Sequence, residues 1–64
     1  MRDLEQDKHR IRAAIQAAGI NEIVYISPNH YDGGYEVRVG TRDIFVEYPV
    51  LDAGEGNWVN ALRD

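Results

Sequence analysis

The hydrophobic pattern of this chain changes period once, at Gly19, and no other feature constrains the fold as much. Up to residue 18, apolar residues recur at the three- and four-residue spacing of a helix, and Gly and Pro are absent. After residue 19, apolar residues fall in short runs that Gly- and Pro-containing turns separate. One helix followed by several short strands is typical of an α+β domain.

The first segment predicts an amphipathic helix over Asp3–Ala18. Its polar side carries acidic residues in the first turns and basic residues after them, which suits the helix dipole. Gly19 can adopt the left-handed conformation that ends a helix. The apolar stripe of this helix consists of Leu4, Ile11, Ala14, Ile15 and Ala18.

Three strands are predicted after the helix, over Ile20–Ser27, Tyr35–Val39 and Asp43–Tyr48. The segment Pro28–Gly34 has the residues of a turn, and Gly40–Asp43 is a short hairpin connection. Short connections between strands of similar length favour an antiparallel meander with the second strand in the middle.

The pattern weakens after Pro49, where we expect a short closing helix. Asp52 and Glu55 have the spacing of a capping box, and Asn57 is an equally good cap for a helix that starts at Trp58. The whole chain, residues 1–64, is therefore predicted to be one α+β domain of two layers in the order α-β-β-β-α. The N-terminal helix should pack on the sheet face formed by Val37, Val39, Ile44 and Val46.

Composition excludes several classes of protein. Without cysteine, the chain has no disulfide, no thiolate metal site and no cysteine nucleophile. Its longest run of apolar residues, Ile23–Ile26, is far shorter than the ~20 residues that cross a bilayer, and no apolar signal segment follows Met1. We therefore expect a cytoplasmic protein without membrane contact. Because its core is small, dimerisation through free strand edges is expected to supplement stability, so a homodimer is predicted.

The net charge of −4 is unevenly distributed. Residues 1–18 carry four basic and three acidic side chains, whereas residues 19–64 carry three basic and eight acidic ones. Proteins that bind nucleic acid directly need cationic side chains to replace counterions on phosphates, so this excess argues against direct binding of nucleic acid. It favours either solubility alone or attraction to a basic protein partner.

The first strand is apolar on both sides, although a meander places it at an edge. Ile23 and Tyr25 alternate with Val24 and Ile26. We expect the sheet face away from the helix to have an apolar centre of Val24, Ile26 and Phe45, with a charged rim of Glu22, Glu36, Arg38, Asp43 and Glu47. Such an arrangement is typical of a protein interface. The alternative is that Trp58 and Leu62 cover this face.

The loop after the first strand contains His30, Tyr31 and Asp32. A histidine near an aspartate can act as a general base, and both can bind metals. However, Ser27, Thr41 and tyrosines are the only candidate nucleophiles, and the two histidines and scattered carboxylates have no metal-site spacing. We therefore predict no enzymatic activity, no metal and no cofactor, and we interpret His30 and Tyr31 as recognition residues.

The leading hypothesis is a small acidic interaction protein, an inhibitor or accessory factor of the kind that phages and mobile elements encode. It would dock its acidic sheet face on a larger, basic protein that handles nucleic acid. The predicted partner-binding residues are Val24, Ile26, His30, Tyr31, Glu36, Arg38, Asp43, Phe45 and Glu47.

The element order also resembles that of the double-stranded RNA-binding domain, and His30 beside a Gly-rich turn is similar to the hairpin histidine of HicA-type toxins. These resemblances imply an alternative function, an RNA-binding or RNA-cleaving module that uses His30. They cover only the order of elements: the last helix of the RNA-binding domain starts with basic residues, where this chain has Asp52-Ala53-Gly54-Glu55.

A further alternative is a small dimeric subunit of a larger assembly.

Overall fold

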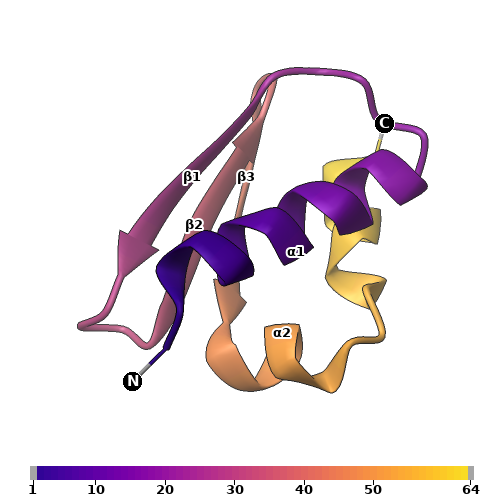
Figure 1. Ribbon diagram of the computed structural model, residues 1–64. Helices are drawn as coiled ribbons and strands as arrows, with labels where there is room; N and C mark the ends of the chain where they lie inside the picture. The colour runs from indigo at the N-terminus through magenta and orange to yellow at the C-terminus, as the bar shows by residue number, and fades with distance from the viewer. Residues whose placement is uncertain (1, 64) are drawn as a thin grey trace.

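A three-stranded antiparallel sheet forms one layer of the computed structural model, and three helical segments form the other layer (Figure 1). The structure describes residues 2–63. In chain order its elements are α1 (Leu4–Ala17), β1 (Val24–Asn29), β2 (Gly34–Val39), β3 (Arg42–Glu47), α2 (Tyr48–Ala53) and the 3-10 helix η1 (Asn57–Leu62). The predicted helix, meander and closing helical segment are confirmed, as is the α+β class.

Helix α1 begins and ends for local reasons. The side chain of Asp3 accepts a hydrogen bond from the backbone N–H of Gln6 at 3.1 Å, which satisfies one of the free donors of the first turn. At the other end, Gly19 takes a φ of 82°, a conformation that costs glycine little and other residues more. The predicted span of Asp3–Ala18 thus includes both capping residues.

The sheet has the strand order β1-β2-β3, with the predicted central position of β2. Strand β1 begins four residues later than expected, at Val24, and continues past Pro28 to Asn29. Pro28 lies opposite Tyr35 in the ladder. A proline fits there because β1 is an edge strand, where a missing N–H on the solvent side removes no bond of the sheet.

One apolar core lies between the two layers. The sequence-predicted stripe of α1 contributes Ile11 and Ile15, which are 0 and 1% exposed. From the sheet come Val37, Ile44 and Val46, with Ile44 opposite Val37 and only partly buried. The predicted packing of the helix on this face is confirmed. The other buried members of the core are Tyr35, Val39, Leu51, Val59 and Leu62.

The C-terminal segment forms two helical pieces where one was expected. Helix α2 begins at Tyr48, directly after β3, because Pro49 has the fixed φ that suits a first helical turn. Gly54 and Gly56 both have a φ of 73°, and these two left-handed residues separate α2 from η1. The predicted caps are therefore wrong: Asp52 lies within α2, and Gly56 precedes η1 in place of Asn57.

No helix within residues 2–63 combines the length and the hydrophobicity that crossing a membrane requires.

Candidate functional site

The sheet face that points away from the helical layer, here termed the outer face, is uncovered in the described part of the chain. Phe45 and Tyr25 lie on it and are 40% and 63% exposed. A groove of about 560 Å³ follows this face. Its lining includes Tyr25, Ser27, Glu36, Arg38, Asp43 and Phe45.

Neighbouring strands bring these side chains together through the ladder register. Glu36 in central strand β2 lies between Ser27 of β1 and Phe45 of β3. Arg38 lies between Tyr25 and Asp43 in the same way. Directly opposite residues in antiparallel strands share a face, so six residues that are distant in sequence form one surface.

The predicted place of Val24 and Ile26 on this face is wrong. The register pairs Val24 with Val39 and Ile26 with Val37, so both side chains lie on the core face, where they pack partly buried against the core. Tyr25 occupies the outer face in their place. Because both sides of β1 are apolar, the alternation could not reveal which side faces the helix.

The alternative cover for the outer face is also wrong. Leu62 is fully buried in the core, and Trp58 packs against that core as well. Both residues belong to η1, which lies in the helical layer on the opposite side of the sheet (Figure 1).

The position of Phe45 is linked to a glycine on the neighbouring strand. A Cβ atom added to Gly34 would lie 2.7 Å from Cζ of Phe45, so the ring approaches the bare backbone of Gly34 closely. An aromatic ring over a strand glycine shields backbone that would otherwise be open to water. This contact covers part of the ring of Phe45, a residue that is 40% exposed.

The charged groups of the outer face differ in whether they have a partner. Arg38 Nε donates to Asp43 Oδ1 at 2.8 Å, and this hydrogen bond lowers the pKa of Asp43 and raises that of Arg38. Glu36 and Glu47 are exposed and form no ion pair within residues 2–63. Because Asp43 is already paired with Arg38, the carboxylates of this face that remain available to an external cation are those of Glu36 and Glu47.

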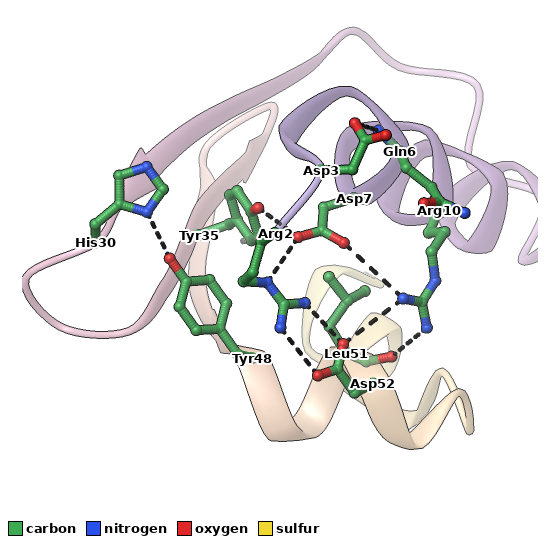
Figure 2. A network of polar contacts seen from close by, with 10 residues as sticks. All are labelled: Arg2, Asp3, Gln6, Asp7, Arg10, His30, Tyr35, Tyr48, Leu51 and Asp52. Carbon is green, nitrogen blue, oxygen red and sulfur yellow. Dashed lines mark hydrogen bonds and ion pairs between the residues drawn. The ribbon is translucent and has the colours of Figure 1, made fainter.

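The loop residues His30 and Tyr31 are separate from this surface. Tyr31 is fully exposed at the turn, whereas His30 Nδ1 lies 2.6 Å from the hydroxyl oxygen of Tyr48 at the start of α2 (Figure 2). The turn is stabilised by Asn29, whose side chain accepts from the backbone N–H of Asp32 and donates to its carboxylate. Of the predicted partner-binding residues, Glu36, Arg38, Asp43, Phe45 and Glu47 share the outer face, and His30 and Tyr31 do not join them.

A network of polar side chains centred on Asp7 was not predicted from the sequence. Asp7, which is 4% exposed, accepts hydrogen bonds from Arg2 Nε at 2.9 Å and from the Tyr35 hydroxyl at 2.5 Å (Figure 2). Arg2 also forms a two-pronged ion pair with Asp52, at 2.7 and 3.0 Å. Asp7 precedes Ile11 by one helical turn, so an acid on the apolar stripe was the available signal.

This network, with Asp7 and Tyr35 as its buried members, joins α1, β2 and α2. Arg10 donates to the Leu51 carbonyl at 3.0 Å, and the Arg2 guanidinium lies 4.1 Å from the centre of the Tyr48 ring. Burial first, and the bond to Asp7 second, raise the pKa of Tyr35 to about 12, so its hydroxyl stays a proton donor. The hydrogen bonds from Arg2 and Tyr35 both go to Oδ2 of Asp7, while its Oδ1 faces Arg10 at 3.9 Å. The network therefore holds the helical layer to the sheet.

The described residues bring no three His, Asp or Glu side chains together in a geometry that could hold a metal ion. Comparisons of the chain with protein-family models, with curated proteins and with solved structures find no match.

Proposed function

We propose that this chain is a non-enzymatic interaction protein that docks its outer face on a larger, basic protein. The observation that supports this function is the exposed aromatic side chains of Tyr25 and Phe45 on the same face as Glu36 and Glu47, two carboxylates that form no ion pair within residues 2–63. Apolar surface that excludes water, combined with complementary charge, supplies both affinity and orientation in protein interfaces.

The charge of the face argues for the class of partner. A basic surface would gain two ion pairs with Glu36 and Glu47, and Arg38, the cation that the described residues place on this face, already pairs with Asp43. Proteins that handle nucleic acid present such basic surfaces to phosphates. Carboxylates docked there would compete with the phosphates, so the proposed role is that of an inhibitor or accessory factor, of the kind that phages and mobile elements encode.

The test uses a short Arg-rich peptide as the probe and the isotope-labelled chain as the receptor. Nuclear magnetic resonance should show shift changes at Tyr25, Ser27, Glu36 and Phe45. Binding should weaken as salt rises from about 50 to about 300 mM, because screening shortens the range of exposed charges. A matched Glu-rich peptide should leave the spectrum unchanged.

Charge reversal provides the matched variants. The double substitution Glu36→Lys and Glu47→Lys should abolish binding of the peptide. The control, Glu5→Lys with Glu55→Lys, makes the same change in net charge at exposed positions of the helical layer and should retain binding. Equal binding by both double variants would contradict the proposal. Binding of an RNA duplex with shift changes centred on His30 would favour the RNA-acting alternative.

A further inference from the structure

Strand β1 is a free edge of the sheet. Its one partner in the described structure is β2, and no element lies beyond it (Figure 1). The segment around its start is exposed, with Ile23 at 72% and Tyr25 at 63%. An edge strand presents unpaired backbone donors and acceptors that a further strand can bind.

The two edges of the sheet differ in how they resist such pairing. Strand β3 contains Arg42, Asp43 and Glu47, and it contacts α2 and η1. Strand β1 contains no charged residue, and the stretch without Asp, Glu, Lys or Arg runs from Ile23 to Tyr31. Charges on edge strands are a common protection against strand addition, so β1 lacks the protection that β3 has.

Pro28 indicates which backbone groups of β1 are available. A proline is accommodated in a ladder when the side of its missing N–H faces outward. Backbone direction alternates along a strand, so Val24 and Ile26 also direct their N–H and C=O groups away from β2. The edge therefore offers a short segment for pairing, Val24–Ile26, which ends where Pro28 supplies no donor.

We propose that this segment pairs antiparallel with the same segment of a second copy of the chain, with Tyr25 on the two-fold axis. In this register Val24 of one copy exchanges hydrogen bonds with Ile26 of the other, and no bond requires a donor from Pro28. The two Tyr25 side chains lie directly opposite each other on the outer face. The dimer then has one continuous six-stranded sheet.

Charge selects a second copy as the occupant of this edge. Two chains that each carry −4 repel each other overall, and at the uncharged edge they can approach without bringing like charges together. A basic partner gains no ion pair along β1, whereas it gains two on the neighbouring outer face. A single strand from each copy is smaller than a standard interface, so the dissociation constant should be on the order of 100 µM.

The absence of cysteine permits a direct test of the register. Residues opposite each other in a non-hydrogen-bonded pair have Cβ atoms about 4.5–5.5 Å apart, close to the separation that a disulfide spans. Tyr25→Cys should therefore form a disulfide-linked dimer in a glutathione redox buffer. The control is Tyr31→Cys, which places the same group at a fully exposed loop position. The effective concentration of the Tyr25→Cys pair should exceed that of the control by about tenfold or more.

A second measurement uses the unlinked chain. Sedimentation at several concentrations should show a reversible dimer, which Tyr25→Lys abolishes and Phe45→Lys retains; spectra that show folded chains in both variants complete the experiment. Equal crosslinking of Tyr25→Cys and Tyr31→Cys would overturn the proposal, as would a dimer unaffected by Tyr25→Lys. The Glu36→Lys and Glu47→Lys variant should still dimerise, so this test is independent of binding to a basic partner.

Discussion

At the scale of single residues, Asp7 shows how one buried charge organises a small core. Its carboxylate lies within the apolar interface and accepts from Arg2 and from Tyr35. Removing a charge from water costs several kcal/mol unless hydrogen bonds and opposite charges replace the lost hydration. The three partners that surround Asp7, including the more distant Arg10, provide this compensation.

We expect Asp7→Asn to destabilise the fold by about 2–4 kcal/mol, because the buried Tyr35 hydroxyl and the partly exposed Arg2 guanidinium lose a charged acceptor. Urea denaturation followed by fluorescence would measure the change in the free energy of unfolding. The control Glu5→Gln removes an exposed carboxylate from the same helix and should change stability by less than about 0.5 kcal/mol. Similar stability of the two variants would show that the network contributes little.

At the scale of elements, the close approach of β2 and β3 depends on Gly34. A Cβ atom at this position would clash with the Val46 carbonyl oxygen and would lie 2.9 Å from Cα of Glu47. Both are backbone atoms, so relief requires the strands to move apart. The same glycine accommodates the ring of Phe45 on the outer face, and it thereby links strand pairing to the shape of the candidate site.

Gly34→Ala should therefore destabilise the sheet by about 2 kcal/mol or more through steric overlap. Thermal unfolding of this variant can be compared with that of Gly19→Ala. Gly19 has open space around it, so its substitution costs only the left-handed backbone conformation, about 1–2 kcal/mol. A Gly34→Ala variant as stable as the parent would contradict the dependence of this strand pairing on Gly34.

At the scale of the whole molecule, Arg2 connects the start of the chain to α2. Its guanidinium pairs with Asp52, fifty residues away, while its Nε reaches Asp7 in α1. The segment before α1 is thereby held against α2, where the Arg2 guanidinium also lies over the Tyr48 ring. The hydrogen bond from Arg2 lowers the pKa of Asp52 below its ordinary value of 3.8.

This lowered pKa gives a direction for the dependence of stability on acid. The folded state binds a proton at Asp52 less readily than the unfolded state, so the ion pair stabilises the fold above about pH 4 and this contribution is lost as pH falls through the folded pKa. Asp52→Asn should lower stability at neutral pH and should reduce the loss of stability below pH 4. Denaturation between about pH 2 and pH 7 measures both effects. An acid response identical to that of Glu55→Gln would contradict this assignment.

Comparison of sequence and structure separates local from long-range information. Helix α1, the antiparallel meander and the central place of β2 followed from periodicity and turn residues, which act within a few positions. The two-piece C-terminal segment did not, because two glycines and a proline within eight residues are compatible with several helix starts. The role of Asp7 was missed because its partners Arg2 and Tyr35 meet it only after the layers pack.

By itself, therefore, the sequence determined that the chain is an acidic, cysteine-free α+β domain in which one helix precedes three strands and a helical segment. Composition and local pattern carry that information. Only the tertiary structure decided which side of β1 faces the core. Because both sides are apolar, the choice depended on the register with β2, which places Val24 and Ile26 against buried valines. The same register places Tyr25 on the outer face. The tertiary structure therefore decided the composition of both candidate binding surfaces, the outer face and the free edge of β1.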